Sequence, residues 1–416
     1  MMQKRHQLVF MAFLAIFICY MDRVSISVAI IPMVDDYGWD LTTQGLVLSS
    51  FFVGYLLLQI IGGKLADRFG GKIVLGFGVL LWSIFTILTP PAAAFGLAAL
   101  VTVRILMGMG EAVTFPAIFA QYARWIPLKE RSRSVAFSNS GLPLGTVFAL
   151  LATPVIVNTL GWEWVFYLFG ATGFFWCIAW LYWIAPSPQT QAGISPQELA
   201  LIEADAVSDS IAPATPWRAL LTNMPVWAII VAHFCNNWSL YVLLAWLPTF
   251  VNKGLGVDYA SIGIYAMMPH IASFICLNIA GNFADRMIGG GMSVTRVRKI
   301  MMLVGFGGII ASLMVVGGIK DAVTAIAVMT AGSALGAFVI GGFFVNHMDI
   351  APRHAGTLMG ITNTAGTIPG IIGVAVSGWI LETTGSWALL FQVTAAVTAF
   401  GLVFYLLFAS GERQVD

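Results

Sequence analysis

The sequence predicts an all-α membrane protein with twelve transmembrane helices in two six-helix pseudo-repeats. Its composition is 59% hydrophobic and 9% charged, whereas a typical soluble domain has about 25% charged residues. Twelve apolar runs are each long enough to cross the ~30 Å hydrocarbon core of a bilayer. A short motif also recurs at corresponding places in the two halves. We therefore expect the lipid bilayer to be the main solvent of this chain.

The twelve apolar runs follow one another along the chain, separated by polar segments. They lie near residues 8–32, 44–66, 72–91, 96–122, 133–158, 163–185, 224–250, 258–284, 298–318, 322–347, 352–381 and 386–409. The first run is longer than the apolar region of a signal peptide and lacks a small-residue cleavage site. We expect it to remain as a membrane span.

The longest polar segment divides the spans six and six. We expect an N-terminal six-helix bundle at residues 1–185, a cytoplasmic linker at 186–222 and a C-terminal six-helix bundle at 223–416. Within the linker, Ser195-Pro196-Gln197-Glu198 has the pattern of a capping box with proline at the first helical position. This pattern predicts a short surface helix.

The distribution of basic residues predicts the orientation. If the N-terminus is cytoplasmic, 16 of the 20 Lys and Arg residues lie on that side, and only Lys253 and Lys320 lie in the opposite loops. Both termini should then be cytoplasmic, in a bacterial inner membrane or, alternatively, in an organelle membrane with any transit peptide absent. The net charge of +1 predicts no nucleic-acid partner. We expect a monomer.

An internal repeat supports the two-halves organisation. Gly63-Lys-Leu-Ala-Asp67-Arg68 and Gly281-Asn-Phe-Ala-Asp285-Arg286 are offset by 218 residues and follow the second and eighth spans. Such a recurrence indicates parallel repeats, with substrate bound between them near mid-membrane. We expect Asp67, Arg68, Asp285 and Arg286 to gate the rocking of the halves; the alternative is ordinary topology-setting charge.

Charged residues inside spans are the first functional candidates, because each costs about 2.5 to 3.5 kcal/mol to insert unless it meets a partner or a cavity. Arg23 in the first span offers a fork of donors that suits a carboxylate or a phosphate. It either binds an anionic substrate or forms a structural ion pair with Asp22 or Glu111. Arg104 in the fourth span either steers or pairs anions or extends to the membrane surface.

Glu111 is the candidate for proton coupling, because a buried carboxyl group can change charge by binding a proton. When protonated it would release its cationic partner to hold substrate, and when ionised it would compete for that partner, so the two ligands are coupled. The alternative is a permanent ion pair with Arg104 or Arg23. Asp22 is either a second protonation site or a structural partner.

Neutral polar side chains complete the candidate substrate site. Asn236, Asn237 and Tyr241 lie on or near the same turns as His233 in the seventh span and can hydrogen-bond polar cargo. His233 and His270 are titratable, but a lone membrane histidine is more often a packing residue. The remaining substrate-binding candidates are Tyr20, Tyr55 and Asn363.

No pattern of catalytic residues or metal ligands is present. No span carries a Ser/His/Asp set, an HExxH motif or a cluster of metal ligands, and the four cysteines lack CxxC spacing. We expect no enzyme activity, no metal and no cofactor. The cysteines should be buried free thiols: Cys19, Cys177, Cys235 and Cys276.

Several segments resemble a known family. GKLADRFGGK (63–72) resembles the loop signature of the major facilitator superfamily. Other segments are similar to its anion:cation symporter branch, which includes sialin, vesicular glutamate transporters, plastid phosphate transporters and bacterial sugar-acid symporters. These segments are CYMDRVSISVAI (19–30), GEAVTFPA (110–117), HFCNNWSLYVLLAWLPTF (233–250), NHMDIAPRHAGTLMGITNTAGTIPG (346–370) and LFASGERQ (407–414).

The resemblance implies a major facilitator fold and roles for three residues. It implies that Arg23 binds the carboxylate or phosphate of an anion, and that Glu111 takes part in proton coupling, with Asp22 also implicated. Vesicular glutamate transporters carry a histidine where this chain has Leu48 and an arginine where it has Asn236. Both departures argue against glutamate as the substrate.

We therefore expect a secondary active transporter of a small organic anion, a sugar acid or other carboxylate, working by proton-coupled symport and alternating access. One alternative is a sodium- or proton-coupled phosphate transporter, and another, of a different class, is a non-transporting membrane receptor. The expected partners are a small anionic substrate, a coupling proton or sodium ion, and the lipid bilayer.

Overall fold

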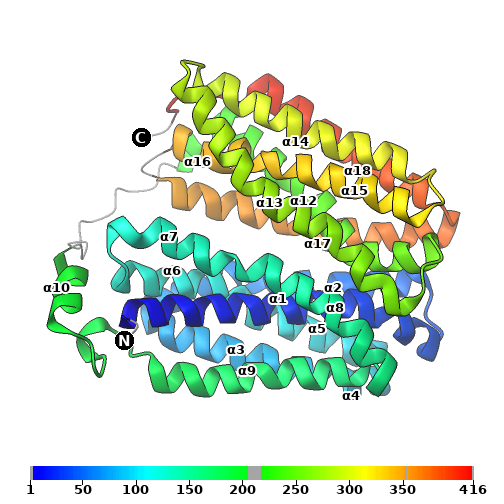
Figure 1. Ribbon diagram of the computed structural model, residues 1–416, viewed down its shortest axis with the longest axis horizontal. Helices are drawn as coiled ribbons and strands as arrows, with labels where there is room; N and C mark the ends of the chain where they lie inside the picture. Colours follow the sequence, from blue (N-terminus) through cyan, green and yellow to red (C-terminus); the bar gives the residue numbers. More distant parts are fainter. Residues whose placement is uncertain (1–2, 205–216, 352–353, 415–416) are drawn as a thin grey trace. The chain divides into compact units, whose positions relative to one another are not determined.

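The computed structural model describes residues 3–204, 217–351 and 354–414, and within them every regular element is a helix (Figure 1). Eleven of these helices are long and apolar enough to cross a membrane, or twelve if the bent pair Gly71–Ile87 and Thr89–Phe95 forms one span. The predicted class, an all-α membrane protein with twelve spans, is confirmed.

Packing divides the chain into two units. Unit 1 comprises Met1–Ala29 and Ser50–Ala212, and unit 2 comprises Ile30–Ser49 and Pro213–Asp416. Sequence order does not reveal that Ile30–Ser49 packs with the second unit.

The helices of the first half of the chain are α1 (Lys4–Tyr37), α2 (Leu41–Phe69), α3 (Gly71–Ile87), α4 (Thr89–Phe95), α5 (Leu97–Ala112), α6 (Thr114–Trp125), α7 (Leu128–Asn139), α8 (Gly141–Leu160), α9 (Glu163–Trp183), the 3₁₀ turn η1 (Pro188–Thr190) and α10 (Pro196–Ala204). Those of the second half are α11 (Trp217–Thr222), α12 (Met224–Thr249), the π turn η2 (Phe250–Gly254), the 3₁₀ turn η3 (Tyr259–Ser261), α13 (Ile262–Gly289), α14 (Val294–Val316), α15 (Ala322–Gly336), the 3₁₀ turn η4 (Ala337–Gly341), α16 (Phe343–Ile350), α17 (Ala355–Thr384) and α18 (Trp387–Phe408).

In unit 1, helix α9 is fixed by two tryptophans. Trp176 Nε1 donates to the carbonyl of Met11 on α1 at 3.0 Å, and Trp180 Nε1 donates to the carbonyl of Lys72 on α3 at 2.9 Å. The two indole rings stack with their centroids 5.0 Å apart. Each indole N–H is thus satisfied while its ring fills the apolar interior.

Glycines bring α2 and α5 into backbone contact. A Cβ atom at Gly108 would collide with the carbonyl of Phe51, and one at Gly54 with the carbonyl of Ile105. Small residues allow this approach in a membrane, where close packing is a main source of helix association. The contact places Phe51 and Tyr55 of α2 beside the part of α5 that carries the candidate site.

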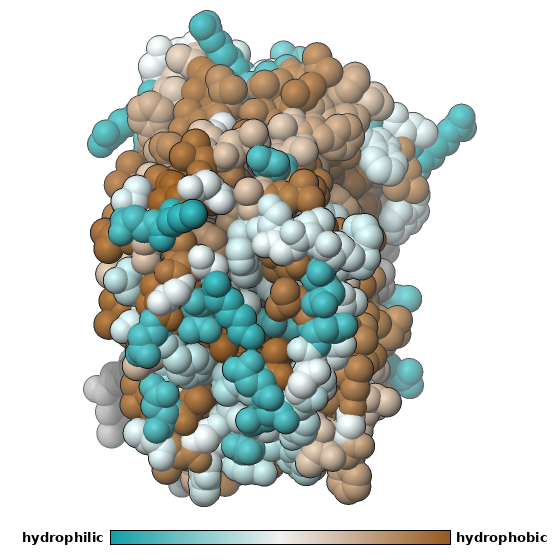
Figure 2. All heavy atoms as spheres, turned by 90° about the vertical axis from the view of Figure 1, so that its right-hand side faces the viewer, coloured by the Kyte–Doolittle hydropathy of each residue, from teal (hydrophilic) through white to brown (hydrophobic). Residues whose placement is uncertain are grey.

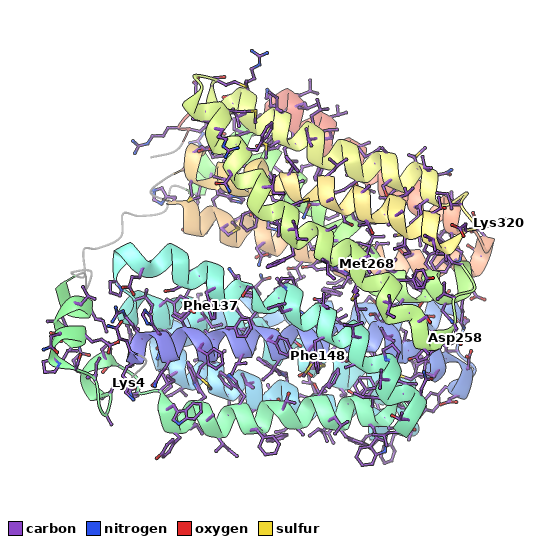
Figure 3. All side chains as sticks on the ribbon, in the orientation of Figure 1. Lys4, Phe137, Phe148, Asp258, Met268 and Lys320 are labelled. Carbon is purple, nitrogen blue, oxygen red and sulfur yellow. The ribbon has the colours of Figure 1, made fainter. Side chains whose placement is uncertain are left out.

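In the expected fifth span, α7 and α8 are separated by a break of one residue, Ser140, and Phe137–Leu160 still forms one candidate span across it. Phe137 and Phe148, one on each side of the break, are labelled in Figure 3. Their rings lie 5.4 Å from Phe13 and 5.5 Å from Phe17 of α1, respectively. Aromatic packing against α1 therefore continues across the break.

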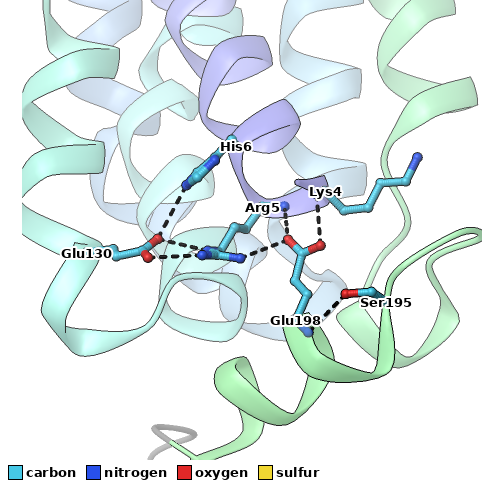
Figure 4. A network of polar contacts seen from close by, with 6 residues as sticks. All are labelled: Lys4, Arg5, His6, Glu130, Ser195 and Glu198. Carbon is cyan, nitrogen blue, oxygen red and sulfur yellow. Dashed lines mark hydrogen bonds and ion pairs between the residues drawn. The ribbon is translucent and has the colours of Figure 1, made fainter. Parts of the chain in front are cut away.

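The short linker helix predicted at the capping box is present as α10. Ser195 Oγ accepts from the Glu198 N–H at 3.1 Å, as a capping box requires. The Glu198 carboxylate turns away from α10 and accepts from the Lys4 and Arg5 N–H groups, at 3.1 and 2.9 Å (Figure 4). Glu198 thus caps the N-terminus of α1, where the helix dipole favours an anion.

Arg5 links this cap to α7. Its guanidinium donates to both carboxylate oxygens of Glu130, at 2.8 and 3.0 Å, and to Glu198 at 3.2 Å (Figure 4). Hydrogen bonding to Arg5 holds the pKa of the Glu130 carboxyl below its usual value. The network fastens α10 to α1 and α7 within unit 1.

Unit 2 is built around α12, which packs against α17 and α18. One of its spans is discontinuous: α15 ends in η4, and α16 begins after Gly342. Arg298 of α14 donates to the carbonyl of Gly341 at 3.0 Å and to Asp349 at 2.7 and 3.2 Å. The arginine thereby satisfies a backbone carbonyl at the break.

The segment Ile30–Ser49 is bonded to the rest of unit 2. Gln44 Nε2 donates to Thr249 Oγ1 at 2.9 Å, and the Leu41 N–H donates to Glu382 at 2.9 Å.

Short aspartate caps start two helices of unit 2. Asp40 accepts from the Thr43 N–H at 2.6 Å, and Asp321 accepts from the Thr324 N–H at 2.8 Å. In both, hydrogen bonding to the threonine lowers the pKa of the aspartate. These are N-caps of the usual kind.

Polar residues gather where the helices end. Asp258 and Lys320 lie at the same end of unit 2, in the loops before α13 and before α15 (Figure 3). Figure 2 views the molecule from that end, and hydrophilic residues gather in the middle and lower part of this view, with mostly hydrophobic residues above them. Of the expected buried thiols, Cys276 is only partly buried, because it lies beside exposed apolar residues of α13.

Candidate functional site

The central feature of unit 1 is a buried ion pair between α1 and α5. Arg23 is 7% exposed and Glu111 is fully buried. Arg23 Nη2 and Nε donate to Glu111 Oε2 at 2.7 and 3.0 Å. The other oxygen, Oε1, has no hydrogen-bond partner among the described residues. The arginine therefore binds the carboxylate through one oxygen and leaves the second available.

Aromatic rings surround the Arg23 guanidinium. Its Cζ atom lies 4.6 Å from the ring centroid of Tyr20, 4.9 Å from that of Phe51 and 5.0 Å from that of Tyr55. Such cation–π contacts stabilise a cation where water is scarce. Cys19, one turn before Arg23, donates to Glu111 Oε2 at 3.1 Å. Of the sequence-predicted residues, the structure brings together Arg23, Glu111, Tyr20 and Tyr55.

Asp22 and Arg104 are two further buried charges near this pair. Asp22 is fully buried, and neither of its carboxylate oxygens has a hydrogen-bond partner among the residues that the structure describes. Arg104 is 1% exposed, its Nη1 lies 3.2 Å from Met107 Sδ, and its Cζ lies 5.5 Å from the Phe51 ring. Within the described part of the chain, neither residue forms an ion pair. This cluster of α1 and α5 thus holds four charged side chains, of which Arg23 and Glu111 are paired.

The unit 2 candidates lie on α12 and α17. Asn237 is 6% exposed, and its Nδ2 donates to the carbonyl of Gly366 at 2.8 Å. Its Oδ1 accepts from Asn236 Nδ2 at 3.1 Å, and Asn236 itself is half-buried. Tyr241, one turn further along α12, and Asn363 on α17 are also half-buried.

The gating candidates are described only in part. The side chains of Asp67 and Asp285 lie outside the described residues. Arg68, at the end of α2, is exposed, with its guanidinium 5.3 Å from the ring of Phe69. Arg286, near the end of α13, is also exposed.

Comparison with known proteins gives the family. The model of the Major Facilitator Superfamily matches residues 12–374. The chain is 42% identical over 413 residues to the chloroplastic ascorbate transporter of Arabidopsis thaliana, covering 99% of this chain and 76% of that protein. It is 38% identical over 445 residues to human (Homo sapiens) sialin, covering 99% and 90%. This chain belongs to the major facilitator superfamily, in its anion:cation symporter branch.

Solved structures of the superfamily share the fold. A bacterial homologue of the lysosomal transporter Spinster superposes with a TM-score of 0.76 at 16% identity, covering 99% of this chain and 96% of that one. A D-xylose–proton symporter superposes with a TM-score of 0.75 at 16% identity, covering 97% and 98%. The superfamily member described here is an integral membrane transporter and not an enzyme.

Sequence reasoning missed one polar cluster of this transporter. His347 on α16 and Thr362 on α17 are almost fully buried and hydrogen-bond each other, with His233 of α12 on the other side of Thr362. Both lie in the segment 346–370 quoted for the family resemblance, but neither was singled out for chemistry. The sequence shows only that a histidine and a threonine lie in apolar surroundings. It does not reveal that Thr362 bonds to His233, which is 129 residues away in the sequence.

Proposed function

We propose that this protein is a secondary active transporter of a small organic anion, a sugar acid or another carboxylate, driven by proton symport through alternating access. The single observation that supports it most is the Arg23–Glu111 pair. Arg23 holds Glu111 through one oxygen at 2.7 Å in a buried surrounding lined by aromatic rings. A substrate carboxylate can bind the same guanidinium through the same kind of hydrogen bond as the Glu111 carboxylate.

The coupling follows from competition for one cation. Ionised Glu111 occupies Arg23, so an anion must displace it. A proton placed on Oε1, which has no hydrogen-bond partner in the described part of the chain, neutralises Glu111 and frees the guanidinium. Proton binding and anion binding at this site then favour each other, because each removes the obstacle to the other.

Asp22 is the proposed second protonation site. An ionised carboxylate without a partner is strongly disfavoured in an apolar interior, and both Asp22 oxygens lack a hydrogen-bond partner within the described part of the chain. Arg104, which is buried near Phe51, is proposed to attract the anion along its path through its positive charge. Asn236, Asn237, Tyr241 and Asn363 are proposed to supply neutral hydrogen bonds to the cargo.

We also propose that both termini are cytoplasmic, that the membrane is a bacterial inner membrane and that the protein is a monomer. The transport cycle is proposed to be gated by the loops that carry Asp67, Arg68, Asp285 and Arg286. These proposals rest on the distribution of charge and the internal repeat.

A second candidate is cation-coupled uptake of inorganic phosphate. It is supported by 43% identity to the chloroplastic sodium-dependent phosphate transport protein 1 of Arabidopsis thaliana, over 99% of this chain and 80% of that protein. Phosphate also suits an arginine fork.

One experiment separates the candidates. Proteoliposomes are given an inward proton gradient or an inward sodium gradient and offered labelled gluconate, ascorbate, sialic acid or phosphate. The proposal predicts accumulation of a carboxylate with the proton gradient alone. Accumulation of phosphate only would replace it with the second candidate, and accumulation of a carboxylate only with sodium would reject proton coupling. Binding without accumulation would favour a receptor.

A further inference from the structure

Two buried histidines and a threonine form a hydrogen-bonded chain inside unit 2. His233 lies on α12, His347 on α16 and Thr362 on α17, and each is 5% exposed or less. Thr362 Oγ1 is 3.1 Å from His233 Nδ1 and 2.8 Å from His347 Nε2. His347 Nδ1 is 2.8 Å from the carbonyl of Phe344. The chain therefore joins three helices through one hydroxyl.

The direction of each hydrogen bond follows from the partners. A carbonyl only accepts, so His347 Nδ1 carries a hydrogen and donates to Phe344. In a neutral imidazole, Nε2 is then an acceptor, and Thr362 must donate to it. Because the hydroxyl has one hydrogen, Thr362 must accept from His233 Nδ1. Both histidines are thus assigned the Nδ1–H tautomer.

The link between α12 and α17 does not depend on the charge of His347. Thr362 Oγ1 also lies 3.2 Å from the carbonyl of Met359. If His347 bound a proton, its Nε2–H would donate to Thr362, whose hydroxyl would turn to Met359. His233 would donate to Thr362 in both cases.

Other charged and titratable groups on the packed helices have partners of their own or lie apart from the chain. Arg298 of α14 is paired with Asp349 of α16, and Tyr405 of α18 is bonded to Asn346. His354 is buried at the start of α17. No ion pair to His233 or His347 is found in residues 3–204, 217–351 and 354–414.

A second contact between α12 and α17 has the same register. Asn237 is bonded to Gly366, one turn beyond His233 and Thr362, and both pairs are separated by 129 residues. A Cβ at Gly366 would lie 2.8 Å from His233 Cδ2 and 2.9 Å from Asn237 Nδ2. The two hydrogen bonds fix the register of α12 against α17. The lack of a side chain at Gly366 allows their close spacing.

We propose that Thr362 and His347 are positioning residues for substrate binding. They hold His233, and through the next turn of α12 they fix the Asn237 amide and the half-buried Asn236 amide bonded to it. This inference rests on the proposed function, in which Asn236 and Asn237 hydrogen-bond the anion.

The test compares Thr362→Val with Thr362→Ser in proteoliposomes supplied with labelled gluconate, ascorbate, sialic acid and phosphate. Valine has the shape of threonine but leaves His233 Nδ1 and His347 Nε2 unpaired, so we expect KM to rise about tenfold with little change in maximal rate per folded molecule. Serine should restore KM. The matched control is Thr364→Val, which should leave KM unchanged. Among the described residues, the Thr364 hydroxyl bonds within its own helix, to the carbonyl of Gly360 at 2.8 Å.

The dependence of uptake on an imposed proton gradient should be the same in Thr362→Val as in the parent, because Arg23 and Glu111 are untouched. An unchanged KM in Thr362→Val, or a loss that serine does not restore, would overturn the positioning role.

If the parent protein took up none of the four anions, the proposed function would fail separately. The hydrogen bonds of Thr362 with His233 and His347 are then tested by ¹⁵N NMR of histidine-labelled protein. We expect Nδ1–H tautomers at both rings in the parent and in Thr364→Val. In Thr362→Val, His233 should lose its preference for the Nδ1–H tautomer, whereas His347 should keep it through the carbonyl of Phe344. Nε2–H tautomers at both rings would overturn the inference.

Discussion

Among the described residues, unit 1 buries a cluster of four charged side chains on the helices α1 and α5, whereas the buried polar side chains in the middle of the unit 2 helices carry no fixed charge. Unit 1 buries Asp22, Arg23, Arg104 and Glu111, each 7% exposed or less. Unit 2 buries histidine, threonine and asparagine side chains that are bonded to each other or to the backbone. Its buried arginine, Arg298, is paired with Asp349 close to helix ends.

This difference separates two tasks that the pseudo-repeats are proposed to perform. A buried charge is costly unless it is paired, so four of them in one unit indicate a site where charge is exchanged. Neutral hydrogen bonds are weaker but directional, and they suit the recognition of hydroxyl groups on a substrate. We infer that the buried groups of unit 1 are suited to exchange charge and that those of unit 2 are suited to form neutral hydrogen bonds.

The largest expected effect comes from removing the cation of unit 1. Arg23→Ala should lower uptake by about 100-fold or more, because a buried charge contact of this kind contributes several kcal/mol. The measurement is initial uptake per folded transporter, with folding checked by size-exclusion chromatography. Arg23→Ala combined with Glu111→Gln, which leaves no unpaired charge at the pair, controls for instability. Near-normal uptake in either variant would remove Arg23 from the substrate site.

The next effect should separate coupling from binding. Glu111→Gln keeps the shape of Glu111 but cannot change charge, so concentrative uptake should be lost while exchange of labelled for unlabelled anion persists. Counterflow and gradient-driven uptake are measured on the same vesicles. Gradient-driven accumulation at the parental level would reject the coupling role.

A smaller effect should follow from disturbing unit 2. Gly366→Ala places a Cβ against His233 and Asn237, so α12 must shift, and we expect KM to rise about fivefold, as for a moderate overpacking cost. Proton coupling should remain. Gly360→Ala on the same helix, where a Cβ meets nothing within 4 Å, is the matched control. Loss of coupling in Gly366→Ala would contradict the division of tasks.

The smallest effect concerns stability rather than transport. The pKa of Glu130 is lowered in the folded protein by its hydrogen bonds to Arg5, so its stabilisation is present above the ordinary carboxyl pKa and is lost as the pH falls through the lowered value. Glu130→Gln should therefore lower Tm at neutral pH. The corresponding loss in the free energy of unfolding should be about 1 kcal/mol or less, because the pair is partly exposed. At strongly acidic pH the two proteins should converge.

The matched control for this change is Glu203→Gln on α10, because Glu203 accepts a bond from neutral Gln189. A difference between Glu130→Gln and the parent that is the same at every pH would show that the Arg5 pair does not carry the effect.

The sequence predicted the spans better than their interruptions. Apolar length is a property of consecutive residues, so all twelve runs were found. The breaks near Ser140 and Gly342 depend on packing and on bonds from distant side chains, such as Arg298 to Gly341. For the same reason the capping box predicted α10 but not that Glu198 caps α1.

The candidate site shows the same limit. Arg23 and Glu111 were found because charge in an apolar run is conspicuous, and their pairing was one of the alternatives that the sequence left open. His347 and Thr362 were not found, since such residues are ordinary in membrane helices and only the fold brings them together.

The most direct test of competition between Glu111 and the anion for Arg23 is the dissociation constant of the transported anion, measured as a function of pH on purified protein. The account predicts that affinity rises as the pH falls in the parent, because protonated Glu111 releases Arg23, and that Glu111→Gln binds tightly at every pH. An affinity that falls with decreasing pH, or an equally steep pH dependence in Glu111→Gln, would contradict it.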